Sequence, residues 1–311
     1  MEPEIKKALI ELGAGRIALD ASLADLTTFG LGGPAAALAE PDTLEELTRL
    51  MQFIHAQDLP WFILGGGSNI LVRDGGFPGV AVRLGRGFAE VTANADGGQI
   101  LVRAGASTPT AQLLAFCRRE GYAGLEFLAG IPGWIGGALV MNAGTHDGQI
   151  MDRVTRVTCL NQDAGIEDIP REQLKAGYRK LELPEGVIIL GAEFRLEAST
   201  PEAVDAKVKD NLARRASTQP KGVKSAGCIF KNPPGDYAGR LIDEAGLKGK
   251  SAGRAWVSDE HANFIVHRGK ATAGQVLRLI DRVRQTVLEK YRVELETEIR
   301  IVGVDGEEAT E

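Results

Sequence analysis

A run of three glycines followed by two polar residues is the segment of this chain best suited to hold an anion. It lies between two short apolar runs and comprises Gly65, Gly66, Gly67, Ser68, Asn69 and Ile70. Glycines let successive backbone N–H groups turn toward one anion, and the serine and asparagine can add side-chain donors. The loop therefore predicts a diphosphate site. The competing interpretation is a tight turn between strands, which one or two glycines would satisfy.

A second glycine-rich segment, residues 130–144, is too apolar for an exposed loop and too rich in glycine for the interior of a helix or strand. We expect a flat or chain-like group to lie against its backbone, although a buried structural crossover would have a similar composition. Residues 30–35 fit the pattern GxGxxA, but no convincing strand precedes them and no long helix follows. We therefore predict a turn there and no dinucleotide-binding loop.

Three side chains elsewhere have chemistry that depends on their surroundings. Cys228 lies in a glycine-flanked loop three residues before Lys231, and a cation can lower the pKa of a thiol, although most cysteines are small buried hydrophobes. Taken alone, Arg179 and Glu298 are expected to be charged side chains exposed to solvent. Cys117 and Cys159 lie in apolar patterns and are expected to be buried and inert. No histidine has a partner at metal-ligand spacing, so we expect no metal.

Helices and strands alternate irregularly, which indicates an α+β chain. Thr43 and Glu46 form a capping box at the start of an amphipathic helix. Further helices are expected at 109–120, with Thr108 as N-cap and Gly121 at its end, from residue 200 onward, and at 272–290. The strands expected are 61–64, 69–72, 80–84, 100–104, 153–160, 187–197 and the alternating segment 293–301, which places Glu298 on its polar face.

Composition limits the class of protein. With 311 residues the chain is too long for one ordinary core of ~100–150 residues, and its net charge of −6 argues against nucleic-acid binding. The longest stretch without polar side chains, 127–141, is shorter than the ~20 residues that span a bilayer, and no apolar signal core begins the sequence. Three cysteines without CxxC spacing fit a reducing compartment. We expect a cytoplasmic protein with no membrane association.

The motifs, taken in order, resemble one family, the UDP-N-acetylenolpyruvoylglucosamine reductases, also called UDP-N-acetylmuramate dehydrogenases (MurB). The matching stretches are TTFGLGG (27–33), LGGGSNILVRDGGFPGV (64–80), GLEFLAGIPGWIGGALVMNAG (124–144), GYR (177–179), SAGCIFKNP (225–233), HANFIV (261–266) and ETEIRIVG (296–303). Each stretch is weak by itself, and the ordered set is specific. The short C-terminal part resembles the branch that lacks an extra substrate-capping insertion.

The resemblance implies an FAD-binding domain of the PCMH type, as in vanillyl-alcohol oxidase, over 24–198, with lobes at about 24–82 and 83–198. A smaller α+β substrate domain would follow at 199–311. The FAD, bound without a covalent link, would contact Gly65, Gly66, Gly67, Ser68, Asn69, Ile70, Ile131, Pro132, Gly133, Gly136, Gly137, Ala138, Asn142 and Gly144. NADPH would be the co-substrate. The resemblance does not define the oligomeric state, and a monomer is compatible with it.

The resemblance also implies the catalytic roles. Arg179 matches the arginine that polarises the substrate carboxylate, Glu298 the glutamate near the enol carbon, and Cys228 the proton donor, which is more familiar as serine. Substrate-binding positions are Tyr178, Lys231 and Asn232. His267 stands where asparagine is expected and receives no role. The implied reaction is reduction of the enolpyruvyl ether of UDP-N-acetylglucosamine to UDP-N-acetylmuramate, in peptidoglycan precursor synthesis.

Two rival functions use the same loops. An oxygen-using oxidase of the PCMH type often tethers its flavin through a histidine in the diphosphate loop, and the segment GGGSN has none. A flavin-binding regulatory protein would need the glycine-rich segments but has no use for Arg179, Cys228 and Glu298 together.

Overall fold

The computed structural model describes residues 1–96 and 99–306; residues 307–311, at the end of the expected C-terminal domain, lie outside the described part. The helices are α1 (Pro3–Glu11), α2 (Leu44–Ala56), α3 (Thr110–Glu120), α4 (Ile135–Val140), α5 (Pro201–Thr218), α6 (Ala238–Glu244) and α7 (Ala273–Tyr291). The strands are β1 (Arg16–Ser22), β2 (Pro34–Glu40), β3 (Trp61–Ile63), β4 (Ile70–Val72), β5 (Phe77–Val82), β6 (Val91–Asp96), β7 (Gln99–Gly105), β8 (Tyr122–Ala123), β9 (Gly144–Thr145), β10 (Gly148–Gln149), β11 (Val154–Leu160), β12 (Ile166–Pro170), β13 (Lys175–Gly177), β14 (Lys180–Glu182), β15 (Ile188–Ala198), β16 (Ser251–Ala252), β17 (Ala255–Val257), β18 (Ile265–Val266) and β19 (Arg300–Val302).

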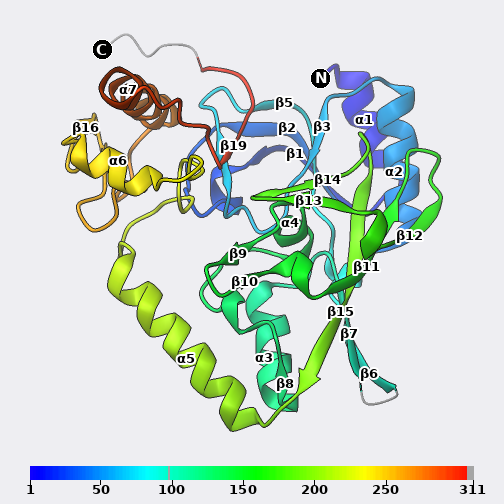
Figure 1. Ribbon diagram of the computed structural model, residues 1–311. Helices are drawn as coiled ribbons and strands as arrows, with labels where there is room; N and C mark the ends of the chain where they lie inside the picture. Colours follow the sequence, from blue (N-terminus) through cyan, green and yellow to red (C-terminus); the bar gives the residue numbers. More distant parts are fainter. Residues whose placement is uncertain (97–98, 307–311) are drawn as a thin grey trace.

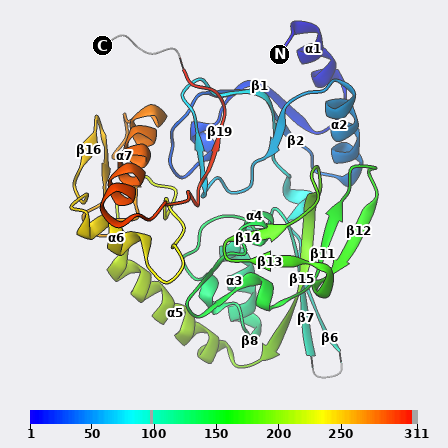
Figure 2. The same cartoon turned by 45° about the horizontal axis from the view of Figure 1, so that its top comes forward.

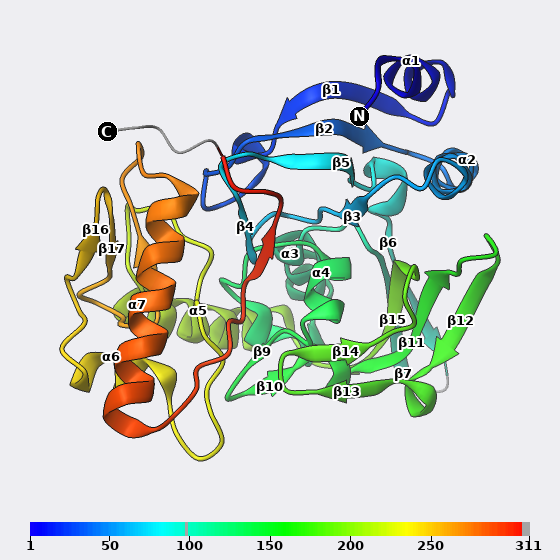
Figure 3. The same cartoon turned by 90° about the horizontal axis from the view of Figure 1, so that it is seen from above.

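Two sheets form the first two thirds of the chain (Figure 1). In the first sheet, β1-β2-β5-β3, the strands β2 and β3 are both parallel to β5. The second sheet, β12-β11-β15-β7-β6, is antiparallel, and β15 lies at its centre. Helix α4 packs against β7 and β15 of the second sheet. Seen from above, the first sheet lies apart from the second (Figure 3).

A smaller unit of α6, α7 and the sheet β16-β17-β18 follows the long helix α5, which runs away from the end of β15 (Figure 2). Its core contains one face of α7, where Val276, Leu279 and Val283 are almost fully buried. Phe29 and Leu31, from the loop before β2, belong to the same cluster. The two parts of the chain therefore share apolar packing at this loop.

The chain returns to the first part at its end. Strand β19 pairs in parallel with β4, which places Arg300 opposite Ile70, directly after the loop of three glycines. The Asp74 carboxylate accepts hydrogen bonds of 2.8 Å from the first two backbone N–H groups of α7, those of Ala273 and Gly274. The final strand and the α7 N-terminus thus hold the C-terminal unit against β4 and the residues that follow it.

Most of the expected elements are confirmed, including the Thr43–Glu46 capping box, the left-handed Gly121 after α3, and the starts of α5 and α7. Residues 34–40 form strand β2, which the sequence did not predict, so no long helix follows residues 30–33. The prediction of Thr108 as the N-cap of α3 is wrong, and Pro109 occupies that position. The carbonyl of Thr108 accepts a hydrogen bond from the N–H of Ile135 and so is not used by the first turn of α3.

Two further expectations are corrected. Residues 135–140 form a helix although Gly136 and Gly137 lie inside it. Its first N–H groups, those of Ile135 and Gly136, donate to the carbonyls of Thr108 and Ala106, and a Cβ on Gly136 would lie a tight 3.1 Å from the Ala106 Cβ. The expected strand 293–301 is reduced to β19, with a single bridge between Thr297 and Phe230 before it. This segment contacts two different units in turn, so it has no continuous partner strand. No helix within the described ranges is both long and apolar enough to cross a membrane.

Candidate functional site

The two glycine-rich segments, 66 residues apart in sequence at Gly67 and Gly133, lie side by side. A Cβ on Gly66 would lie 2.7 Å from the Cα atom of Gly133, so the two backbones are in contact. The Ser68 hydroxyl donates a 2.9 Å hydrogen bond to the carbonyl of Pro132. The Thr110 hydroxyl holds the second segment from behind, through a 2.6 Å hydrogen bond to the carbonyl of Ile131. The two loops form one surface, which we call the glycine cradle (65–69 and 130–137).

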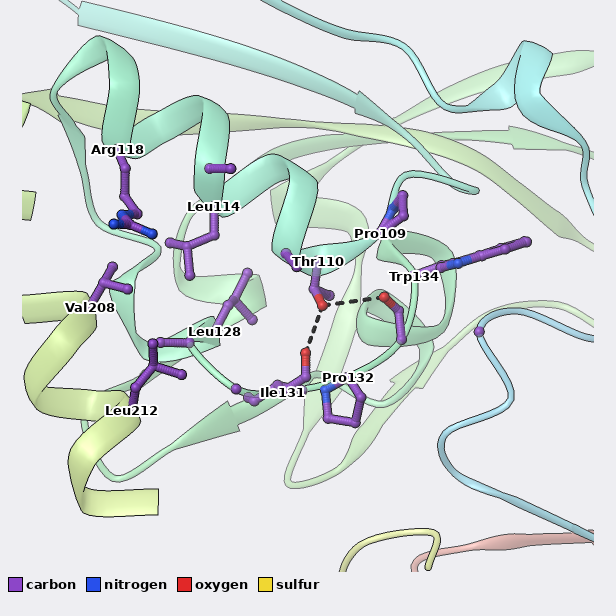
Figure 4. A pocket seen from close by; sticks show the side chains of 16 residues that line it. Pro109, Thr110, Leu114, Arg118, Leu128, Ile131, Pro132, Trp134, Val208 and Leu212 are labelled. Atoms are coloured by element: carbon purple, nitrogen blue, oxygen red, sulfur yellow. Dashed lines mark hydrogen bonds between the residues drawn. The ribbon is translucent and has the colours of Figure 1, made fainter. Parts of the chain in front are cut away.

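A cavity of about 460 Å³ opens on one side of the cradle (Figure 4). Its lining includes Gly66 from the first loop and residues 129–134 from the second, closed by apolar side chains of α3 and α5 such as Leu114 and Leu212. Arg179, Cys228 and Glu298 do not line it. The cavity therefore offers a binding space along the cradle that is separate from these three side chains.

The cradle contains close-packed and open glycines. Gly67 has a φ of +66°, and a Cβ there would meet the Leu26 carbonyl at 2.0 Å, so its role is structural. At Gly65 and Gly137 nothing lies within 4 Å of an added Cβ. No packing within the described chain explains glycine at these two positions. A cofactor lying along the backbone would explain both, and FAD fits this requirement.

Other expected cofactor contacts have partners within the protein. One Asn69 amide N–H donates to the Glu298 carbonyl at 3.1 Å, and the Ser68 hydroxyl is used on Pro132. The Ser68 hydroxyl hydrogen and one Asn69 N–H are therefore used within the protein, and the second Asn69 amide N–H and the backbone N–H groups are the donors that remain for an anion. Five of the candidate positions are buried: Gly67, Ile70, Ala138, Asn142 and Gly144.

Arg179 lies at the tip of the hairpin formed by β13 and β14. Gly177 pairs with Lys180, so Tyr178 and Arg179 form the two-residue turn, and Arg179 has a φ of +55°. A non-glycine residue in this left-handed region needs support from its surroundings. The Arg179 Nε lies 3.0 Å from the Glu298 Oε1 atom, with 23% and 16% of the two side chains exposed. The ion pair is largely shielded from solvent.

Backbone contacts from both parts of the chain fix Glu298. Its N–H donates to the Ile229 carbonyl at 2.7 Å, and its carbonyl accepts from Asn69. The expected position on the solvated face of a strand is wrong for this residue, because the segment passes between the cradle and the 225–233 loop. Burial raises the pKa of the Glu298 carboxyl, and Arg179 and Lys231 lower it by less. The carboxyl is therefore easier to protonate than an exposed glutamate.

Cys228 faces the same pair. Burial raises the pKa of its thiol to about 12, the nearby Glu298 raises it as well, and Arg179 and Arg215 lower it by less. The expectation that Lys231 lowers this pKa is wrong, because the Lys231 Nζ donates to Glu296 at 2.5 Å and desolvation dominates at the sulfur. Cys117 and Cys159 are buried, as predicted, and burial raises the pKa of each to about 12.

Arg215 on α5 was not found from the sequence. Its side chain crosses Gly130, where an added Cβ would lie 3.0 Å from the Arg215 Cδ. Burial lowers the pKa of its guanidinium, the Cys228 sulfur raises it, and Arg179 lowers it. The Nε is buried and has no hydrogen-bond partner among the described residues. The sequence has adjacent arginines at 214 and 215, and nothing in it indicates which of the two points into the protein.

The three expected substrate-binding residues, Tyr178, Lys231 and Asn232, lie at the outer edge of the region around Arg179 and Glu298. Tyr178 is 51% exposed, and its hydroxyl accepts a long 3.4 Å hydrogen bond from the backbone N–H of Asn232. The Asn232 side-chain oxygen accepts from the N–H of Ala238, at the start of α6. The contact between Tyr178 and Asn232 therefore joins the hairpin that contains Arg179 to the loop that contains Cys228. We call Arg179, Arg215, Cys228 and Glu298 the charged cluster.

Buried polar side chains hold the loops of this region. The Asn263 amide bonds both the N–H and the carbonyl of Phe230, at 2.9 and 2.8 Å. His267, fully buried, bonds the Phe29 carbonyl through Nε2 at 2.7 Å. Burial lowers the pKa of His267, which fits a neutral imidazole that joins the 27–33 loop to the C-terminal unit. The motif HANFIV thus fixes the backbone beside Cys228.

Comparisons with known proteins agree with this arrangement. The family model described as "FAD binding domain" matches residues 35–169, and that described as "UDP-N-acetylenolpyruvoylglucosamine reductase, C-terminal domain" matches residues 219–302. A UDP-N-acetylenolpyruvoylglucosamine reductase of Syntrophus aciditrophicus is 42% identical over 303 residues, with 97% of each chain covered. One from Geobacter sulfurreducens is 42% identical, with 93% of this chain and 95% of its own length covered.

A solved structure extends the agreement to three dimensions. The UDP-N-acetylenolpyruvylglucosamine reductase (MurB) of Thermus caldophilus superposes with a TM-score of 0.78 at 41% identity, covering 92% of this chain and 98% of that one. The expected PCMH-type FAD-binding fold with an α+β C-terminal part is confirmed. The sequence, the fold and the meeting of the cradle with the charged cluster show that this chain belongs to the UDP-N-acetylenolpyruvoylglucosamine reductase family.

Proposed function

We propose that this chain reduces the enolpyruvyl ether of UDP-N-acetylglucosamine to UDP-N-acetylmuramate, with FAD as cofactor and NADPH as hydride source, in the cytoplasm. The observation that supports this most strongly is the shielded Arg179–Glu298 pair beside Cys228, next to the glycine cradle. A single copy of the chain contains the whole cluster, so a monomer suffices. We also propose the division into 24–198, with lobes at about 24–82 and 83–198, and 199–311.

The glycine cradle and its adjoining cavity would hold FAD. Gly65 and Gly137 leave room for it, and backbone N–H groups of both loops would bind the diphosphate. The whole set proposed is Gly65, Gly66, Gly67, Ser68, Asn69, Ile70, Ile131, Pro132, Gly133, Gly136, Gly137, Ala138 and Gly144, some of them through packing behind the contact surface. Bound FAD supplies hydride transfer, from NADPH to the terminal carbon of the enolpyruvyl group.

Arg179 would bind the carboxylate of the enolpyruvyl group, and Arg215 gives the same region a second cation. Negative charge that spreads onto the carboxylate after hydride addition is stabilised by preorganised cations in a site that excludes water. Because burial raises the pKa of Glu298, its carboxyl would take up a proton more readily than that of an exposed glutamate, and its protonated form would donate a hydrogen bond to that charge. Tyr178, Lys231 and Asn232, at the rim, would contact the nucleotide part of the substrate.

Cys228 would supply the proton to the carbon adjacent to the ether oxygen. A general acid must carry its proton when the negative charge forms, and a thiol pKa of about 12 keeps it protonated at neutral pH. The developing negative charge beside the thiol then favours transfer. A serine hydroxyl of similar size could do the same, since its pKa is higher still.

Anaerobic stopped-flow mixing tests this proposal. We expect NADPH to reduce the bound flavin quickly, and the enolpyruvyl nucleotide to reoxidise it in a second mixing step. An oxidase would be reoxidised by oxygen and not by this nucleotide. A flavin-binding regulatory protein would be slow in both steps. Either pattern would contradict the proposed function.

A further inference from the structure

Asn142 is the residue after helix α4 whose carboxamide is completely enclosed. It is 1% exposed and has a φ of +40°. The N–H of Ala143 bonds the Ala138 carbonyl at 2.8 Å, and the N–H of Asn142 bonds the Leu139 carbonyl at 2.9 Å. These two bonds form a Schellman motif with Asn142 at its left-handed position. Glycine is the usual residue there, so asparagine must be explained by its side chain.

The Asn142 side chain makes three hydrogen bonds, all within the protein. Its Nδ2 donates to the Gly177 carbonyl at 3.0 Å and to the Gln149 Oε1 at 2.9 Å. Its Oδ1 accepts from the N–H of Met151 at 3.2 Å. A carboxamide has two N–H donors, and both have acceptors here. This leaves no donor of the side chain free for a cofactor.

The Gly177 carbonyl is the point at which this amide meets the catalytic hairpin. Gly177 is the last residue of β13, and the turn of Tyr178 and Arg179 follows it directly. Arg179 adopts a left-handed backbone conformation, which needs external support, and its guanidinium faces Glu298 at 3.0 Å. Gln149 is fixed in turn, because its Nε2 donates to the Asp152 Oδ1 at 3.0 Å.

We propose that Asn142 is a positioning residue, which holds the Gly177 carbonyl so that the adjacent turn presents Arg179 to Glu298 and to the substrate carboxylate. The inference rests on the role given to Arg179 under the proposed function. It replaces the contact with FAD that the family resemblance implies for Asn142. The amide connects the second glycine-rich segment, and so the cradle, to the charged cluster.

The substitution Asn142→Gly tests this role, since glycine accepts the left-handed backbone and removes only the amide. With Arg179 misplaced, reoxidation of the reduced flavin by the enolpyruvyl nucleotide should slow by about 10- to 100-fold, whereas reduction by NADPH should stay near the wild-type rate. The dissociation constant for FAD, from fluorescence titration of the apoprotein, should not change. Asn161→Gly, the same change in the turn between β11 and β12, should leave all three quantities as in the wild type.

A second variant and a double mutant keep the test decisive. Asn142→Asp retains an oxygen for the Met151 N–H but has no donor for the Gly177 carbonyl, so it should slow the same step if the glycine variant does not fold. In an Arg179→Ala background, Asn142→Gly should add little, because the residue it positions is gone. Weaker FAD binding, equal loss in both half-reactions, or additive effects in the double mutant would each overturn the proposal. Failure of the wild type to be reoxidised by the nucleotide would instead refute the proposed function.

Discussion

The glycine cradle and the charged cluster adjoin each other but are built differently. The cradle consists of backbone, and its specificity comes from the absence of side chains at positions such as Gly65 and Gly137. The cluster consists of side chains brought from the hairpin at 177–180, helix α5, the loop around Cys228 and the segment before β19. A local stretch of sequence can produce the first, whereas only the complete fold can produce the second.

Electrostatics differ between the two regions in the same way. The cradle loops, 65–69 and 130–137, contain no ionisable side chain. In the cluster, burial raises the pKa values of Cys228 and Glu298 and lowers that of Arg215. In each case desolvation disfavours the charged form. The comparison therefore predicts that changes in the cluster affect the reaction with substrate, and that changes in the cradle affect the affinity for FAD.

The largest effect is expected from Arg179→Ala. The variant loses the cation that faces Glu298 at 3.0 Å and, on our proposal, the contact with the substrate carboxylate. Removing one preorganised donor costs about 100- to 1000-fold in rate, so stopped-flow reoxidation by the nucleotide should slow by this factor. The FAD dissociation constant should stay unchanged. Arg16→Ala, which removes an arginine with 78% of its side chain exposed, is the control and should have neither effect.

Cys228→Ala should slow the same step by about 100-fold, the lower range for a general acid, and Cys228→Ser should retain most of the rate. The pH dependence follows from the pKa of about 12: the thiol carries its proton below that pH and loses it above. Between about pH 7 and 10 the wild-type rate of reoxidation should therefore not fall through loss of this proton. A clear decline with a midpoint near ~8.5, the ordinary thiol pKa, that is absent from Cys228→Ser would show that Cys228 is not shielded as described.

The smallest and most selective effect is expected from Gly137→Ala. An added Cβ meets nothing within 4 Å and lies inside helix α4, so the apoprotein should gain up to ~1 kcal/mol in unfolding free energy. If FAD occupies that space, its dissociation constant should rise at least about tenfold, or ~1.4 kcal/mol. Gly239→Ala in helix α6, whose Cβ would make ordinary contact with His261 at 3.5 Å, should stabilise the helix without affecting FAD. Unchanged FAD affinity in Gly137→Ala would place the cofactor elsewhere.

The sequence predicted the cradle better than the cluster for a physical reason. Glycine content and helix periodicity are local signals, and they predicted helices α2, α3, α5 and α7, the longer strands such as β7, β11 and β15, and both loops. They did not predict α1, α4 or α6, or most of the short strands. Arg215 gave no signal, because its burial depends on α5 crossing Gly130 from 85 residues away in sequence. Glu298 was expected in solvent for the same reason. Local alternation could not show that its segment passes between two units.

Short-range patterns were also misleading where tertiary contacts decided the outcome. Thr108 is a good N-cap by type, but its carbonyl is used by Ile135 and its hydroxyl is buried without a partner among the described residues. Gly136 and Gly137 argued against a helix, yet residues 135–140 form one, and its first N–H groups find acceptors in the carbonyls of Thr108 and Ala106. Lys231 near Cys228 in sequence predicted a lowered thiol pKa, whereas the lysine pairs with Glu296.

The division of labour between the two regions is tested most directly by a single-turnover measurement on Glu298→Gln. The variant is first reduced with NADPH without oxygen and then mixed with the enolpyruvyl nucleotide, and flavin reoxidation is followed by absorbance. We predict normal reduction and reoxidation slowed by about 100-fold or more. Glu294→Gln, in which an 80% exposed side chain of the same segment is changed, should match the wild type in both steps. Wild-type reoxidation by Glu298→Gln, or equal losses in the two variants, would contradict the account.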